Sequence, residues 1–125
     1  MSWKPPQIAR YLIGALHLLF MVGELYPWNC PRIMAAVLKE RHLVLADNDK
    51  AFVATVVHNA GIYNGIVALT LFVSASYGSS AFGIQVALLI GGIVAGLFGA
   101  ATLTIAVIAQ AIAGAIALAL VWFCR

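Results

Sequence analysis

The longest uncharged segment of the chain comprises residues 51–124 and reads AFVATVVHNAGIYNGIVALTLFVSASYGSSAFGIQVALLIGGIVAGLFGAATLTIAVIAQAIAGAIALALVWFC. It contains no Asp, Glu, Lys or Arg. A membrane-spanning helix needs about 20 apolar residues, so this segment is long enough for three spans joined by two short turns. Apolar and polar residues do not alternate along it, as they would in the strands of a membrane barrel. The pattern therefore predicts helices.

A further apolar run lies towards the N-terminus, after Pro5 and Pro6 and before Pro27 and Pro31, and prolines of this kind bound a helix. The segment 77–80 and a very short segment at 102–104 are the predicted turns of the later part. The four predicted spans are about residues 8–28, 52–76, 82–101 and 105–123. An even number of spans places both termini on one side of the membrane. A signal peptide is an alternative for the first run, although no clear small-residue cleavage site follows it.

The composition supports a membrane protein. Of the 125 residues, 64% are hydrophobic and 9% are charged, whereas soluble domains are about half apolar and about a quarter charged. So few charges argue against a soluble enzyme, a nucleic-acid-binding protein and a disordered tail, and the net charge of +3 does not suggest a nucleic-acid partner. We expect an all-α integral membrane four-helix bundle, a single transmembrane domain over residues 1–125, with the lipid bilayer as its main partner.

The one sizeable loop, residues 29–50, carries most of the charges. Its segment 31–42 places four apolar side chains on one helical stripe, opposite Lys39 and Arg41. This stripe consists of Ile33, Met34, Val37 and Leu38. The pattern is typical of a short amphipathic helix on the membrane surface between the first two spans, and an ordinary solvated loop is the alternative. The basic residues favour, weakly, a cytoplasmic position for this loop.

Small residues mark the helix faces that are expected to pack, because helices in lipid associate through close contact between small residues. The predicted small-residue faces are Gly61 with Gly65, then Gly92, Gly96 and Gly99, and then Ala106, Ala109, Ala113 and Ala117. We interpret them mainly as packing faces within the bundle, and a homo-oligomer or a membrane-protein partner is a further hypothesis. Four spans place Cys30 and Cys124 at opposite bilayer faces, which excludes a disulfide between them.

Polar side chains within spans usually face the interior of a bundle, because lipid exposure is costly. His17 and Glu24 share one face of the first span, and Trp28 follows one turn later. Asn59 and Tyr63 share a face of the second span. We expect His17 and Glu24 to meet this face, with Asn64 directed away from it, towards a neighbouring span, and Gln110 as the only amide of the last span. Alternatively, Glu24 reaches the interface and pairs with Arg32, and the asparagines only link helices.

Several of these residues match a family signature. The spacing His17-x6-Glu24-x3-Trp28 resembles the first helix of the DUF1304 family of small bacterial membrane proteins. The segment 59–65, Asn-Ala-Gly-Ile-Tyr-Asn-Gly, resembles the family's Asn-Gln-Gly-x-Tyr-Asn-Gly motif, except that Ala60 replaces Gln. The segment 95–102 resembles its third helix, and Gln110 occupies its glutamine position, although no proline follows. The resemblance implies four helices and this polar set, and the layout is similar to that of DoxX-like proteins by fold analogy. It implies no reaction.

Three functions are compatible with these features. The polar cluster His17, Glu24, Trp28, Asn59, Tyr63, Asn64 and Gln110 could form an intramembrane site that binds or transports a small lipophilic ligand. Alternatively, the protein is a structural or accessory subunit of a larger membrane assembly. The third hypothesis is a lipid-modifying enzyme that uses a His and Glu pair for proton transfer. No metal-ligand or cofactor motif is present in the sequence. We expect a multi-pass protein of the cell membrane, specifically a bacterial inner membrane.

Overall fold

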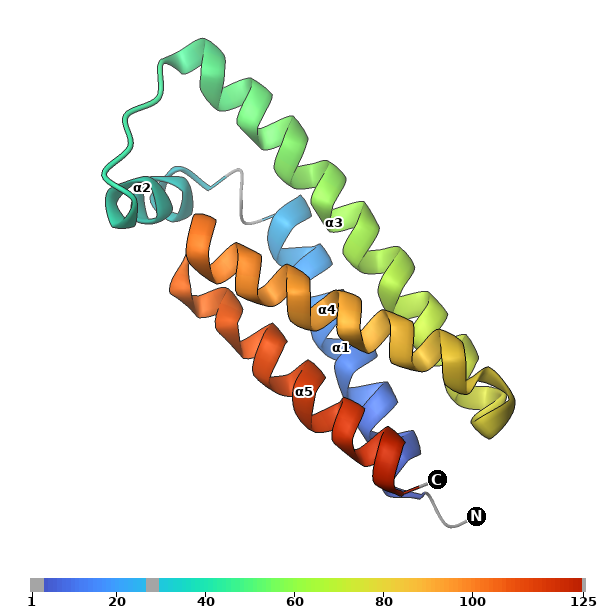
Figure 1. Cartoon of the computed structure of the whole chain (residues 1–125). Helices are drawn as coiled ribbons and strands as arrows, with labels where there is room; N and C mark the ends of the chain where they lie inside the picture. Colours follow the sequence, from blue (N-terminus) through green and yellow to red (C-terminus); the bar gives the residue numbers. More distant parts are fainter. Residues whose placement is uncertain (1–3, 27–29, 125) are drawn as a thin grey trace.

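The computed structural model describes residues 4–26 and 30–124, and every regular element in these ranges is helical. The helices are α1 (Pro5–Leu25), α2 (Pro31–Glu40), α3 (Asp47–Ser76), α4 (Phe82–Thr102) and α5 (Ile108–Phe123), with short 3₁₀ helices η2 (Gly78–Ala81) and η3 (Ile105–Val107). Four segments of this fold are long and apolar enough to cross a membrane. The prediction of an all-α fold with four membrane-spanning helices is therefore confirmed (Figure 1).

Two helices begin before the predicted spans. Helix α1 starts at Pro5, because a proline in the first turn needs no N–H and already has the helical φ angle. Helix α3 starts at Asp47, and its first turn also carries Asp49, where acidic side chains interact well with the helix dipole. The 30 residues of α3 give a helix about 45 Å long, which exceeds a hydrocarbon core of about 30 Å. Its first turns therefore extend beyond the apolar core.

The spans pack as two antiparallel pairs, α1 with α3 and α4 with α5, and α1 also contacts α5. Helices α3 and α4 meet at the η2 turn and diverge towards the end of the bundle that carries α2 (Figure 1). Gly78 adopts a φ of +58° in this turn, a value that suits glycine. The side-chain amide of Gln85, which is fully buried, donates to the carbonyls of Ser74 and Gly78 and holds the turn closed.

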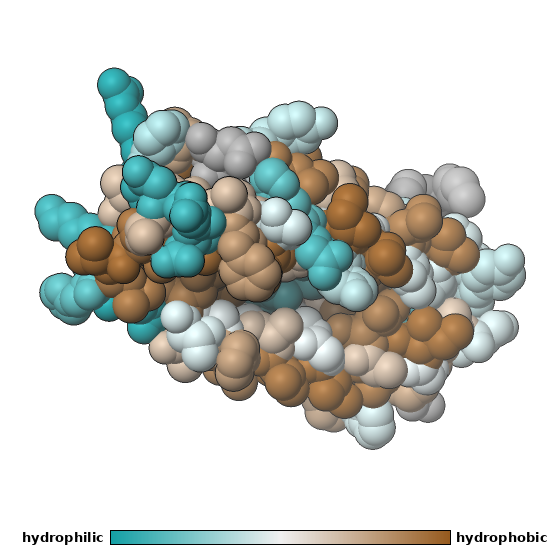
Figure 2. All heavy atoms as spheres, turned by 90° about the horizontal axis from the view of Figure 1, so that it is seen from above, coloured by the Kyte–Doolittle hydropathy of each residue, from teal (hydrophilic) through white to brown (hydrophobic). Residues whose placement is uncertain are grey.

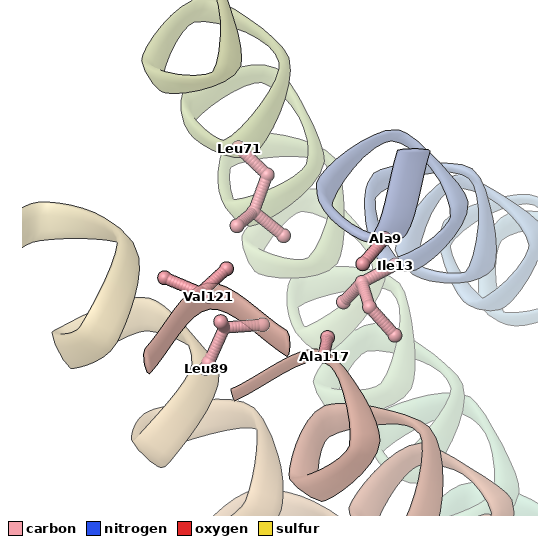
Figure 3. Close-up of a cluster of buried hydrophobic side chains, with 6 residues drawn as sticks. All are labelled: Ala9, Ile13, Leu71, Leu89, Ala117 and Val121. Atoms are coloured by element: carbon pink, nitrogen blue, oxygen red, sulfur yellow. The ribbon is translucent and has the colours of Figure 1, made fainter. Parts of the chain in front are cut away.

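All four spans contribute to one apolar core near the end with the chain termini. Its buried side chains point towards one another in Figure 3 and are Ala9, Ile13, Leu71, Leu89, Ala117 and Val121. Many large apolar side chains outside this core are exposed, including Leu12, Leu69 and Phe98. Exposed apolar surface of this extent fits a molecule surrounded by lipid.

Glycines bring the paired helices into close contact, as predicted for α3 and α4. A Cβ atom on Gly96 would lie 2.6 Å from the backbone nitrogen of Ala111 in α5, and one on Gly65 would lie 2.6 Å from Sδ of Met21 in α1. The predicted alanine face of the last span is partly wrong, because Ala106, in η3, and Ala109, in α5, are exposed. Ala106 lies in a 3₁₀ turn that does not continue the α-helical face, and burial increases along α5 from Ala109 through Ala113 to Ala117. The residues of α5 that meet α4 include Ala111 and Gly114.

The predicted amphipathic helix is present as α2, which lies across the end of the bundle (Figure 1). Within its apolar stripe, Met34, Val37 and Leu38 are half-buried and Ile33 is exposed. Hydrophilic side chains gather at the end of the molecule where α2 lies, while apolar and weakly polar residues cover most of the rest of the face in Figure 2. A solvated loop is therefore excluded for residues 31–40, whereas contact of α2 with a membrane surface stays a prediction.

The end of α2 is fastened to the turn between α4 and α5. The guanidinium of Arg41 donates to the carbonyls of Ala100, Ala101 and Leu103, at 2.7, 3.0 and 2.5 Å. The carbonyls of Ala100 and Ala101 belong to the last turn of α4 and have no partner within the helix, and Leu103 is the residue that follows α4. Arg41 therefore caps α4 from the side.

Glu40 caps the other side of the same turn. Its carboxylate accepts the backbone N–H of Ile105 at 3.0 Å and the hydroxyl of Thr104 at 2.8 Å. The hydrogen bond from the Ile105 backbone, together with that from Thr104, lowers the pKa of the Glu40 carboxyl. Glu40, the last residue of α2, and Arg41, which follows it, thus bind the end of one span and the start of the next, and no pattern in the sequence predicted this arrangement.

The two cysteines lie at opposite ends of the bundle. Cys30 immediately precedes α2, whereas Cys124 follows α5 and lies near Lys4 and Pro6 of the N-terminal end (Figure 1). Both are free thiols. The predictions that the ends of the chain share one face, and that these cysteines do not pair, agree with this arrangement.

Candidate functional site

His17 and Glu24 lie on the inner side of α1, two turns apart. His17 is 2% exposed, and it continues the buried row that includes Ile13 and Gly14. Glu24 is half-buried near the end of the same helix. Polar side chains at these positions need partners from neighbouring helices, because lipid offers none.

Asn64 of α3 is the partner of both. Its Oδ1 atom accepts a hydrogen bond from Nδ1 of His17 at 2.8 Å, and its Nδ2 atom donates to Oε2 of Glu24 at 2.7 Å. The first bond assigns the imidazole proton to Nδ1 and leaves Nε2 as an acceptor in the neutral ring. The chain His17–Asn64–Glu24 therefore joins α1 and α3 through one amide, which is called the amide bridge below.

The prediction that His17 and Glu24 meet the face of α3 with Asn59 and Tyr63 was wrong, because their partner on α3 is Asn64. Gly61 and Gly65 fix the rotation of α3, because their faces contact Glu24, Leu25 and Met21 of α1. Asn64 follows Gly61 by three residues, so it lies on the side of α3 that meets α1. The alternative pairing of Glu24 with Arg32 also fails within the described residues, where Glu24 is bonded to Asn64.

A hollow of about 350 Å³ lies beside the amide bridge. All four spans contribute to its lining, which consists of His17, Phe20, Glu24, Ala60, Tyr63, Asn64, Val67, Leu88, Gly91, Gly92, Ala95, Gly99, Leu103, Val107 and Gln110. Small residues of α4 form one wall, where α3 and α4 diverge (Figure 1). The lining is mostly apolar, and its polar groups are concentrated at the amide bridge and at Gln110.

Part of the hydrogen-bonding capacity around the hollow is unused. Among the described residues, no hydrogen bond is made by Nε2 of His17, by Oε1 of Glu24 or by the side-chain amide of Gln110. A Cβ atom on Gly92 would lie 3.4 Å from Nε2 of His17, so glycine leaves this nitrogen the most room. Together these groups can accept and donate hydrogen bonds to a polar head placed in the hollow.

The structure separates the remaining predicted site residues. Tyr63 is 62% exposed and lies at the edge of the hollow, and Gln110 is buried on the α5 side of it. Asn59 is exposed and does not line the hollow. Trp28 lies outside the described residues. The structure therefore brings together His17, Glu24, Asn64 and Gln110, with Tyr63 at the edge.

The apolar part of the site could not be identified from the sequence. Phe20 and Leu88 line the hollow but belong to long apolar runs, in which no pattern distinguishes an inner side chain from a lipid-facing one. Ala60 also lines the hollow. This position could have been identified from the sequence, because the family motif has a glutamine there. Within residues 4–26 and 30–124 no group of three His, Cys, Asp or Glu residues is placed to hold a metal ion.

The comparisons with known proteins agree with the resemblance. The model of a family described as "Protein of unknown function (DUF1304)" matches residues 11–122, which include α1 from its second turn and almost all of α5. The searches of curated proteins and of solved structures found no match. The matched range contains every residue of the amide bridge and of the hollow.

Proposed function

The chain belongs to the DUF1304 family, and we propose that it is a multi-pass membrane protein that binds a small lipophilic ligand in the hollow beside the amide bridge. One observation carries this proposal. The polar groups that α1 and α5 bring into the membrane border an open space instead of being fully used by each other. A protein that used them only to link helices would gain nothing from the space.

The size and lining of the hollow indicate the class of ligand. Its volume of about 350 Å³ falls at the lower end of the range of about 300 to 1,000 Å³ for small-molecule sites. The apolar walls, including Phe20, Val67 and Leu88, suit a ring or a short chain. The free acceptor on His17 and the amide of Gln110 suit a hydroxyl or carbonyl. A quinone or the head of a neutral lipid combines these properties.

Binding is better supported than catalysis. An enzyme based on a His and Glu pair needs the two groups in contact or joined by a path for a proton. Here Asn64 lies between them and bonds to both, and an amide does not relay a proton readily. The hollow lies where α3 and α4 diverge, so transport of a ligand from the lipid is a natural extension of binding. Its location in the cell membrane, specifically a bacterial inner membrane, is part of the same proposal.

The experiment fills the hollow without removing a polar group. Ala95 lines the hollow, and its neighbour Val94 is 59% exposed on another face of α4. Ala95→Phe should displace the ligand, whereas Val94→Phe adds a ring of the same size towards lipid. Native mass spectrometry of protein extracted from its own membrane then measures the bound mass in the wild type and in both variants.

We expect one small-molecule adduct in the wild type and in Val94→Phe, and its loss in Ala95→Phe with the bundle still folded by circular dichroism. Equal adducts in all three proteins would place the ligand elsewhere. A bare wild-type chain would refute binding and favour the accessory-subunit alternative, in which the same surfaces meet a second copy or a membrane-protein partner.

A further inference from the structure

A second hollow lies at the opposite end of the bundle, near the chain termini, and it is separate from the site proposed above. Its volume is about 400 Å³. Its lining consists of Lys4, Pro6, Gln7, Arg10, Ser76, Tyr77, Gly78, Ser79, Phe82, Val121 and Cys124. Unlike the first hollow, it contains two cationic side chains and several hydroxyl groups and no carboxylate. We call it the terminal hollow.

Arg10 is the unusual residue of this hollow. It is 7% exposed, and its Nε atom is buried without a hydrogen-bond partner among the described residues. Arginine is rarely buried unless its guanidinium is paired, because removing the charge from water is costly. Close by in the fold, Oε1 of the fully buried Gln85 also lacks a partner, although its Nε2 closes the η2 turn.

The protein's own acidic side chains do not neutralise Arg10. The chain has four Asp and Glu residues in total. Glu24 ends α1, Glu40 ends α2, and Asp47 and Asp49 begin α3, so all four belong to the end of the bundle that carries α2. Arg10 and Lys4 belong to the other end and face the terminal hollow together.

We propose that the terminal hollow is an anion-binding site for a phosphate group, held by the guanidinium of Arg10 and assisted by Lys4. Arginine suits this role, because its planar fork of N–H donors matches the oxygens of a phosphate. The hydroxyls of Ser79 and Tyr77 supply further donors around the rim. An anion in this place supplies the partner that residues 4–26 and 30–124 do not provide.

The depth of the site fits the phosphate of a membrane lipid. Helix α1 begins at Pro5, and its 21 residues span about 31 Å, close to the thickness of the hydrocarbon core. Arg10 is five residues further along, about 8 Å from that end, so its long side chain can extend back towards the headgroups. A free phosphate ion from the adjacent aqueous phase presents the same chemistry, and the experiment below separates the two sources.

The test is a thermal titration of the full chain in a nonionic detergent, followed by tryptophan fluorescence. Three probes are added separately: dihexanoyl phosphatidic acid, dihexanoyl phosphatidylcholine and inorganic phosphate. We expect phosphatidic acid or phosphate to raise the Tm of the wild type saturably, by about 5 °C, and high salt to weaken the effect. The zwitterionic lipid should raise it much less. The concentrations at which the two anions saturate the rise in Tm separate the two sources. If phosphatidic acid saturates at a concentration at least about tenfold lower than inorganic phosphate, the ligand is a lipid. If both saturate at the same concentration, the ligand is a free anion.

Variants assign the effect to Arg10. Arg10→Met removes the charge but keeps the apolar stem, so it should melt at the same or a higher temperature than the wild type without anion, and it should not respond to the probes. Arg10→Lys should keep a weaker response. Arg32→Met, which removes an exposed arginine at the other end, is the matched control and should respond like the wild type. A wild type that responds to neither anion, or an Arg10→Met protein that responds as fully as the wild type, would overturn the proposal. The wild-type titration decides even if Arg10→Met does not fold.

Discussion

Replacing Asn64 by Ala removes the one side chain that bonds both His17 and Glu24. Two hydrogen bonds are lost, of 2.8 and 2.7 Å. Hydrogen bonds between membrane helices contribute on average about 0.6 kcal/mol each, so the direct loss is about 1.2 kcal/mol. His17 is 2% exposed and is left without a partner, which adds about 1 kcal/mol. The free energy of unfolding should therefore fall by about 2 kcal/mol.

Unfolding in mixed micelles with increasing SDS, followed by circular dichroism, measures this change. Asn59→Ala is the control, since Asn59 is exposed on the same helix, and it should change the free energy of unfolding by less than about 0.5 kcal/mol. Glu24→Gln should cost less than Glu24→Ala, because the amide oxygen of Gln can still accept the hydrogen bond from Asn64. If Asn64→Ala and Asn59→Ala differ by less than about 0.5 kcal/mol, the amide bridge does not stabilise the bundle and this reasoning is refuted.

Three further predictions concern the rest of the fold. Gly96→Ala should destabilise the protein by about 1 to 3 kcal/mol, because the new methyl group would collide with the backbone of α5, whereas Gly83→Ala meets open space and should be neutral or stabilising in the same SDS titration. The pKa of the Glu40 carboxyl is lower in the folded protein than in the unfolded chain, where it is about 4.3. The contribution of Glu40 to stability is therefore fully present above the unfolded pKa, and it is lost as the pH falls through the folded pKa. The difference in stability between wild type and Glu40→Gln should therefore be present at pH 7 and vanish at acidic pH, and a difference that persists unchanged would argue against this cap. Membrane-impermeant maleimide applied to one side of sealed vesicles should label only one of Cys30 and Cys124, and labelling of both would contradict the four-span topology.

The architecture was predictable because charge and length determine it. The segment after Lys50 has no charged side chain before the last residue, and an uncharged segment of that length forms three spans with little freedom. The glycines of α3 and α4 also indicated where helices approach closely. The start of α3 was predicted too late, because an apolar pattern cannot show that a charged first turn continues the same helix.

The pairing of side chains was less predictable. Asn59 and Tyr63 share a face, which suggested that they would meet α1, but the rotation of α3 is set by Gly61 and Gly65. The position of Asn64 three residues after Gly61 was the signal that could have identified it. The caps made by Glu40 and Arg41 left no such signal, because their partners are mainly backbone atoms about 60 residues away.

The hollow itself was not predictable either. It depends on how far α3 and α4 diverge, which results from the packing of all four spans (Figure 1). The polar residues of a sequence can form a cluster in which every group is hydrogen-bonded to another, or a cluster in which some groups face an empty hollow. The sequence does not distinguish these two arrangements. In this protein that difference decides between a structural and a ligand-binding role.

The most direct test of ligand binding is an NMR measurement on the Asn64 side chain. Protein extracted from its own membrane is transferred to nanodiscs of deuterated lipid, which contributes few proton signals. Apart from protein and water, a retained small molecule is then the main source of protons within the bundle. If the hollow binds a ligand, nuclear Overhauser effects should connect the side-chain amide protons of Asn64 with such a molecule, and they should be lost in Ala95→Phe, which fills the hollow. Effects from water and protein protons alone would refute ligand binding, because the hollow would then hold only water.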